Sequence, residues 1–245
     1  MGILDFLSKE RRHARKVDKA IRRANNKFTP KDYRQIALHD VIEFAKAGDQ
    51  TALKGMLARF NVNAEPSIED EREKEWVCEA LIDIGEPALE QISKALRTAE
   101  SVNWVQRTLR NIVGIEEYRK EMLDVLTDFD TEYERNPDRK IQTIAALADL
   151  PDPDVAKALI RFLEDVDETV RFQTVRSLSE LADESVREAL LKTMCEDESI
   201  RVRNEVVESF AKLGWSTQGF KKKIDGILPS GYKHDKSGKI VKLGS

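Results

Sequence analysis

The chain has 245 residues, of which 35% are charged and 40% hydrophobic, so it is long enough to bury a sizeable core. No run of about 18 apolar residues occurs, which argues against a membrane-spanning helix. The net charge of −4 is unevenly spread: residues 1–35 carry +7, residues 221–245 carry +5, and the residues between them carry −16. The N-terminal layout is not that of a signal peptide, so we expect a cytoplasmic protein.

Residues 1–28 predict a basic amphipathic helix. Its apolar residues are Ile3, Leu4, Phe6, Leu7, Val17 and Ile21. Three hypotheses are open for this segment. It could lie on an anionic membrane surface, dock on acidic helices of its own or another chain, or remain solvated and partly frayed. The sequence does not decide between them.

A helical pattern then recurs along the chain. Its template is the stretch "DETVRFQTVRSLSEL", with apolar or small residues at Val170, Thr174, Val175, Leu178 and Leu181. Matching copies stand 31 residues earlier and 32 residues later, and a further one stands 35 residues before the earlier copy. A more divergent copy ends in "CEALIDIGEPALEQI". Repeats at this spacing predict an array of similar helical units.

Each copy is followed by a break and a second apolar helix, as in "LPDPD" before "VAKALIRFLEDV". Residues 30–60 form a further helical pair that departs from the pattern, as terminal repeats do. Two cysteines, Cys78 and Cys195, lie far apart in apolar helical patterns, and we expect both to be buried, reduced thiols. The pattern therefore predicts antiparallel helix pairs that must stack to cover their apolar faces.

The stretch "EDVDETVRFQTVRSLSELADESVREALLKTM" resembles a HEAT repeat, with an acidic turn before a Val-Arg pair. The pair occurs at Val170-Arg171 and Val202-Arg203, and the resemblance spans roughly residues 67–228. It implies an all-α fold, a right-handed α-solenoid of about six helical hairpins over residues 29–228. The segment "EALIDIGEPALEQI" is similar to variant repeats of phycobilin lyase-type proteins.

Two groups of residues stand out on these helices. Acidic residues one turn before arginines predict an inter-repeat ladder formed by Asp167, Arg171, Asp197 and Arg203. If the helices of the template line the concave face, as the resemblance implies, the candidate partner-binding residues are Ile141, Phe172, Arg176, Asn204 and Glu208. The alternative is that Phe172 and Ile141 pack against a neighbouring helix.

The basic tail, residues 229–245, differs from the repeats. Tyr232–Leu243 predict a small hairpin with its turn at Asp235-Lys236-Ser237-Gly238. Because an isolated hairpin is marginally stable in water, we expect it to lean on the last helices or to remain mobile.

The sequence predicts a non-catalytic scaffold or adaptor that binds a protein partner of basic or mixed charge on the concave face. No catalytic, cofactor-binding or metal-binding residues are predicted, since His13, His39 and His234 are scattered and lack the His-Glu pairs of HEAT-like metal hydroxylases. An alkylpurine DNA glycosylase-like enzyme and a phycobilin lyase-like protein are the alternatives. The acidic repeats disfavour nucleic acid, and the oligomeric state is open.

Overall fold

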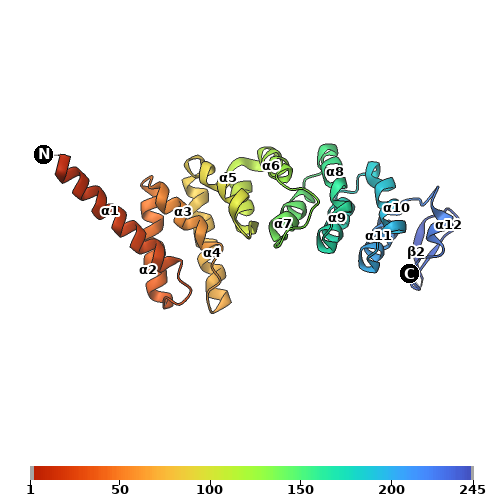
Figure 1. Cartoon of the computed structure of the whole chain (residues 1–245), viewed down its shortest axis with the longest axis horizontal. Coiled ribbons are helices and arrows are strands. Elements are labelled where there is room, and N and C mark those ends of the chain that lie inside the picture. The colour runs from red at the N-terminus through yellow and green to blue at the C-terminus, as the bar shows by residue number, and fades with distance from the viewer. Residues whose placement is uncertain (1–2, 244–245) are drawn as a thin grey trace. The chain divides into compact units, whose positions relative to one another are not determined.

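The computed structural model describes residues 3–243, with side chains described from Lys9 onward (Figure 1). The chain divides into two compact units, residues 1–118 and residues 119–245. The boundary falls inside α6 (Asn103–Thr127), which is interrupted at Gly114 by a left-handed backbone with φ of 77°. Both units are helical, and the sheet within residues 3–243 has only two strands. The predicted all-α fold is therefore confirmed.

Unit 1 begins with paired helices. Its elements are α1 (Ile3–Ala24), α2 (Lys31–Lys46), α3 (Gln50–Arg59), α4 (Ser67–Ile84), η1 (Glu86–Ala88), α5 (Leu89–Thr98) and the first part of α6. The predicted pair over residues 30–60 is α2 and α3, joined by a short turn in which Asp49 caps α3 through the N–H groups of Thr51 and Ala52. Helices α2 and α4 contact each other, as do α3 and α5, so the pairs stack in two layers.

Helix α1 packs on the first pair. Val17, Ala20 and Ala24 are buried, and α1 contacts both α2 and α3. Near the end of α2, the His13 ring lies 2.8 Å from a carboxylate oxygen of Asp49. Residues 13–24 therefore dock on helices of their own chain, which is one of the three hypotheses for this segment. The side chains of Ile3, Leu4, Phe6 and Leu7 lie outside the described residues.

A buried network of charged side chains joins α2, α3 and α4. Arg34 donates to both carboxylate oxygens of Glu73, at 2.7 and 3.0 Å, and Arg59 donates to Glu73 at 2.8 Å. Arg59 also donates to Asp70, and Lys74 pairs with Asp70 at 2.8 Å. Because buried ions must be paired and hydrogen-bonded to be tolerated, this network fixes the mutual arrangement of the three helices.

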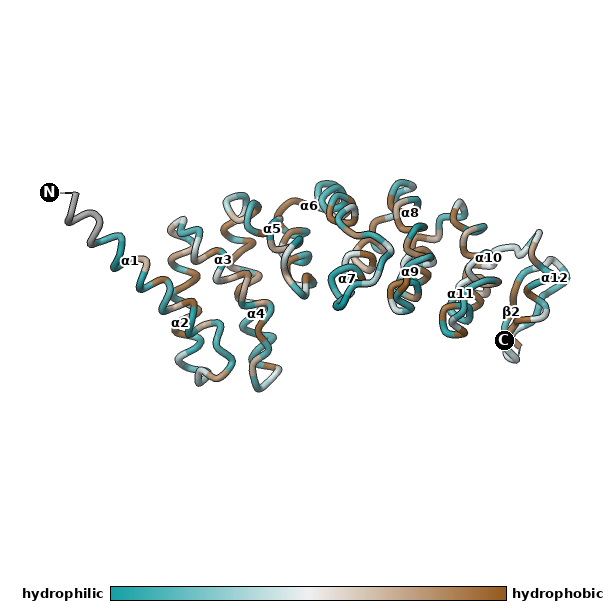
Figure 2. Tube along the Cα trace, in the orientation of Figure 1, coloured by the Kyte–Doolittle hydropathy of each residue, from teal (hydrophilic) through white to brown (hydrophobic). Residues whose placement is uncertain are grey.

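Unit 2 stacks the more regular pairs. Its elements are the second part of α6, α7 (Asp138–Leu147), α8 (Pro153–Leu159), η2 (Ile160–Glu164), α9 (Glu168–Leu181), η3 (Glu184–Val186), α10 (Arg187–Glu196), α11 (Ile200–Leu213), α12 (Lys221–Ile224), β1 (Tyr232–His234) and β2 (Ile240–Lys242). Helix α9 contacts both α7 and α11, so these three form one layer, and η2 and α10 form part of the other. Hydrophobic (brown) and hydrophilic (teal) stretches alternate along these helices (Figure 2), and apolar side chains of both layers are buried.

The repeated template residues form the core of this unit. Val170, Thr174, Val175 and Leu178 are all fully buried. The buried hydroxyl of Thr174 donates to the carbonyl of Val170, four residues earlier in the same helix. The same bond recurs in the two preceding copies, from Thr143 to Arg139 and from Thr108 to Trp104. Threonine is tolerated at a core position because its own helix satisfies its hydroxyl group.

The C-terminal tail forms the predicted hairpin. Strands β1 and β2 are antiparallel, with Tyr232 opposite Lys242 and His234 opposite Ile240. The buried Thr217 hydroxyl donates to the carbonyl of Gly238 at 2.8 Å and lies 2.9 Å from Nε2 of His234, so the hairpin leans on the segment after α11.

Two local predictions were wrong. The expected second helix of the last pair is only the four residues of α12, because Gly226 and Pro229 follow soon after it. Cys195 is half-buried, whereas Cys78 is buried as expected. Burial is the largest influence on both thiols and raises their pKa values, which makes both poor nucleophiles.

Candidate functional site: a groove on the α9–α11 face

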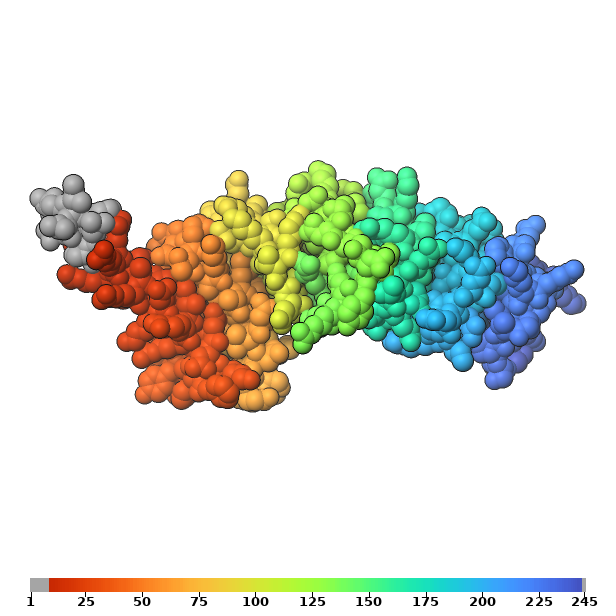
Figure 3. Space-filling view, viewed as in Figure 1, coloured from red at the N-terminus to blue at the C-terminus, as the bar shows by residue number. Residues whose placement is uncertain are grey.

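A groove of about 600 Å³ opens beside the last repeat helices of unit 2. We call it the α9–α11 groove. Its lining residues come from α9, α11 and the C-terminal tail: Phe172, Ile200, Arg201, Asn204, Glu205, Glu208, Pro229 and Tyr232. The part of the surface formed by α11 and the hairpin is blue in Figure 3. The folded hairpin thus supplies one wall of the groove.

Three of the five predicted partner-binding residues line this groove: Phe172, Asn204 and Glu208. Arg176 is exposed on α9, with its guanidinium 3.9 Å from the carboxylate of Glu180. Ile141 is half-buried on α7 and does not line the groove. The structure therefore brings Phe172, Asn204 and Glu208 together and leaves Ile141 apart from them.

Most charged side chains around the groove already have partners within unit 2. The Arg201 guanidinium lies over the Phe172 ring, 3.9 Å from its centroid, and 3.6 Å from the carboxylate of Glu168. Lys242 of the hairpin donates to Glu208 at 2.8 Å. These contacts hold the two aromatic side chains of the groove in place, because Arg201 lies over the Phe172 ring and Lys242 lies over the Tyr232 ring.

Glu205 is the exception. Its side chain is half-buried in the groove, and within residues 9–243 its carboxylate accepts no hydrogen bond and forms no ion pair. Burial is the largest influence and raises the pKa of this carboxyl group, and the negative charge of Glu208 adds to the rise, while Arg176 and Arg201 oppose it. The groove therefore holds a partly desolvated carboxylate and is also lined by two aromatic side chains.

The sequence did not single out Glu205, although it stands beside Asn204. In the repeat register it takes the place of Gln173, a polar position that the hydrophobic pattern of the sequence does not mark as buried. Exposed Ile200 was also missed, and it adds an apolar side chain, 65% exposed, to the edge of the groove. Glu205 and Ile200 both fit an ordinary helical pattern. Their place in a groove becomes evident only from the way the tail folds against α11.

The four residues of the predicted ladder make different kinds of contact. Arg171 pairs with Asp197, which follows α10, and the Asp167 carboxylate caps α9 through the N–H groups of Thr169 and Val170. The equivalent of Arg171 one repeat earlier is Lys140, which pairs at 2.9 Å with buried Asp165. Arg203, one repeat later, is half-buried and has no ion pair among the side chains described. Asp165 and Asp197 occupy the same position in successive repeats, and the next residue at this spacing is Pro229. Arg203 therefore has a proline where Arg171 has the carboxylate of Asp197.

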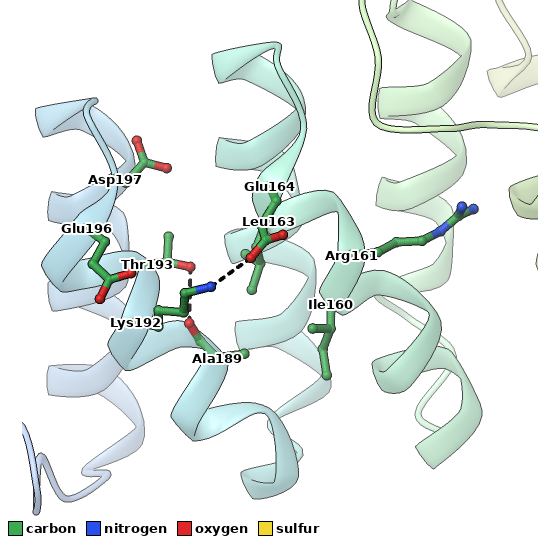
Figure 4. Close-up of a pocket in the computed structure, with 9 residues that line it drawn as sticks. All are labelled: Ile160, Arg161, Leu163, Glu164, Ala189, Lys192, Thr193, Glu196 and Asp197. Carbon is green, nitrogen blue, oxygen red and sulfur yellow. Dashed lines mark hydrogen bonds and ion pairs between the residues drawn. The ribbon is translucent and has the colours of Figure 1, made fainter.

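A second pocket, of about 420 Å³, lies on the other layer of unit 2, between η2 and α10 (Figure 4). Lys192 pairs across it with Glu164 at 2.8 Å. Arg161 points away from the pocket and donates to the carbonyl of Leu126. Lys192, Glu164 and Arg161 of this pocket thus already have partners within the chain. The pocket is therefore a weaker candidate for a binding site than the α9–α11 groove.

Two negative findings concern the described part of the chain. Among these residues, no group of three or more histidine, cysteine, aspartate or glutamate side chains is placed to hold a metal ion. No helix found there combines the length and apolar character needed to cross a bilayer.

Comparison with known families agrees with the repeat pattern. A sequence model described as HEAT repeats matches residues 120–211, which lie within unit 2 and run from α6 to α11. No curated protein matches the chain. The predicted resemblance is thus confirmed over the segment that contains α7, α9 and most of α11. The match therefore supports HEAT-type repeats over residues 120–211.

Proposed function

We propose that this chain is a non-catalytic scaffold that binds a protein partner in the α9–α11 groove. HEAT repeats commonly serve as protein-interaction scaffolds, and the groove lies on a face of such repeats. The observation that carries the proposal is the unpaired, partly buried carboxylate of Glu205 in a groove that Phe172 and Tyr232 also line. A carboxylate in this setting gains most when a cationic group of a ligand reaches it.

The partner chemistry follows from the walls of the groove. An arginine or lysine side chain can place its charged end on Glu205 and its apolar stem against the rings of Phe172 and Tyr232. Exposed Ile200 offers an apolar contact beside it. A partner segment of basic or mixed charge with at least one apolar residue fits this surface best. A nucleic-acid backbone would meet the negative charges of Glu205 and Glu208.

Site-specific photo-crosslinking tests where the partner binds. A benzophenone amino acid is introduced at Asn204 in the groove, and in a matched variant at Lys157, which is exposed on α8. We expect crosslinked protein adducts from Asn204 that are missing from Lys157, and mass spectrometry identifies them. Adducts of equal yield and identity at both positions would contradict the proposal.

The identified partner is then purified, and its affinity is measured for the full chain. Phe172→Ala and Glu205→Gln should each weaken binding by about tenfold or more. Glu188→Gln, on an exposed position of α10, makes the same charge change outside the groove and should leave affinity within about twofold. Equal effects of Glu205→Gln and Glu188→Gln would show that only the overall charge matters.

A further inference from the structure

A second groove, of about 370 Å³, lies in unit 1 between α1 and α2. One wall is formed by Lys16, Lys19 and Arg23 of α1, and the other by Tyr33, Ile36, Asp40 and Phe44 of α2. We call it the α1–α2 groove. It is independent of the α9–α11 groove, since it is built entirely from residues of unit 1.

The α1 wall carries three cations without ion-pair partners. Lys16, Lys19 and Arg23 are exposed, and none of them forms an ion pair within the part of the chain whose side chains are described. By contrast, Lys31 at the start of α2 pairs with Glu69 at 3.0 Å. Residues 9–27 hold nine arginine or lysine residues and two acidic ones, so unpaired positive charge concentrates along this helix.

The α2 wall is mainly apolar at its surface, and Asp40 is its single charged lining residue, so the three cations opposite still leave the groove with net positive charge. Tyr33 is 64% exposed and Ile36 is 62% exposed, although both belong to a helix whose opposite face is buried in unit 1. At the bottom of the groove lie Ala20 and Ala37, two small side chains that are themselves buried. Large apolar groups on one wall and alanines at the bottom leave room for a helix to approach closely.

These features together define the ligand. A ligand complementary to this groove places carboxylates against the cations of the α1 wall and apolar side chains against exposed Tyr33 and Ile36. One helix supplies both when acidic residues flank an apolar stripe, because positions three and four apart share a face. A flat anionic membrane fits less well, since the apolar residues line a hollow instead of projecting from a convex face.

We propose that the α1–α2 groove binds an amphipathic helix of a partner protein, with acidic residues against Lys16, Lys19 and Arg23 and apolar residues against Tyr33 and Ile36. Electrostatic attraction to the α1 wall speeds association, and burial of the α2 wall holds the complex. The site gives the chain a binding surface in unit 1 in addition to the one proposed on the repeats of unit 2.

The test uses a synthetic amphipathic helix with leucines along one face and glutamates on its flanks, labelled with a fluorophore. Its binding to the full chain is followed by fluorescence anisotropy. The triple variant Lys16→Glu/Lys19→Glu/Arg23→Glu should weaken binding by at least about tenfold. The matched control is Arg11→Glu/Arg15→Glu/Arg22→Glu, which makes the same charge change on an adjoining face of α1, about 90° around the helix from the groove wall. It should weaken binding by less than about threefold.

A second variant separates the apolar contact from the charge. Ile36→Ser should also weaken peptide binding by about fivefold or more, while circular dichroism shows an unchanged helix content because this side chain is exposed. Equal losses in the two charge-reversal triples, or no effect of Ile36→Ser, would overturn the proposal. Binding of anionic phosphatidylserine vesicles or duplex DNA in preference to the peptide, abolished by the Lys16/Lys19/Arg23 triple, would also overturn it.

Discussion

Arg171 of α9 donates to both carboxylate oxygens of Asp197, at 2.8 and 3.2 Å, across the loop that leads into α11. The same guanidinium donates to the carbonyl of Asp165 at 2.9 Å. Asp165 in turn accepts a hydrogen bond from Lys140 of α7. A chain of polar contacts therefore runs from α7 through the loop before α9 and α9 itself to the loop that leads into α11.

Breaking one rung should destabilise unit 2. Both side chains of the Arg171–Asp197 pair are nearly buried, so Arg171→Met leaves the Asp197 charge without its partner and should cost about 3 kcal/mol. Urea unfolding followed by the fluorescence of Trp215, the tryptophan of unit 2, measures the loss. Arg203→Met is the control, because this half-buried arginine has no ion pair in the described structure, and its cost should stay below about 1 kcal/mol. Equal losses of unfolding free energy in the two variants would contradict a stabilising role for the Arg171–Asp197 pair.

Unit 1 should lose stability in acid through Asp70. Burial alone would raise the pKa of Asp70, but hydrogen bonds from Lys74, Arg59 and the Ala64 N–H outweigh it and hold the pKa below its ordinary value of 3.8. The folded state thus binds this proton less readily than the unfolded state. The resulting stabilisation is present above pH 3.8 and disappears as the pH falls through the lower folded-state pKa.

The tryptophans of unit 1, Trp76 and Trp104, report its unfolding by urea across this acidic range. The free energy of unfolding should fall steadily as the pH drops below the ordinary pKa of aspartate. Asp70→Asn should lower stability at neutral pH and make the acid-induced fall shallower. A variant with the same acid slope as the natural chain would show that Asp70 does not contribute.

Gly55 should be essential for the docking of α1. A Cβ atom at this position of α3 would lie 2.6 Å from the Ile21 side chain of α1, well inside van der Waals contact. Gly55→Ala should therefore push α1 outward and speed hydrogen exchange of residues 13–24 by about tenfold or more. Gly226→Ala is the control, since the nearest atom to its added Cβ is 3.8 Å away. Unchanged exchange in α1 would mean that Ile21 simply rotates aside.

The C-terminal hairpin should depend on Thr217. Replacing it with valine removes the hydroxyl that bonds Gly238 and His234 while keeping the side-chain volume. Hydrogen exchange of residues 232–242 should then speed up by about tenfold, with α11 unaffected. Ser230→Ala, at an exposed position near the hairpin, should leave exchange unchanged. Exchange rates in the Thr217→Val variant equal to those of the natural chain would contradict this role.

The sequence predicted the core of the repeats well, because the core obeys a simple periodicity. Val170, Thr174 and Leu178 are buried where the helical pattern places them, and the hairpin turns at Asp235 as its glycine and short polar residues indicated. These features are local: each depends on residues within a few turns of one another.

Other features could not be read from the sequence because they depend on which segments meet. Arg171 was expected near Asp167, one turn before it, yet its carboxylate partner is Asp197, beyond the following helix. Glu205 looks like an ordinary solvent-facing residue until the tail folds beside α11. The boundary between the two units falls inside α6 after Tyr118, shortly beyond the break at Gly114, and that break resembles the other breaks between helices.

The central claim is that the α9–α11 groove binds a basic protein segment through Glu205, and one variant separates this role from folding. Because burial raises the pKa of Glu205, its charge is unfavourable in the free chain, and Glu205→Gln should leave the stability of unit 2 unchanged or slightly higher at neutral pH. Partner affinity and urea stability are measured on the same protein. The account predicts at least about tenfold weaker binding with stability unchanged or raised. Unchanged affinity, or weaker binding matched by lower stability, would contradict it.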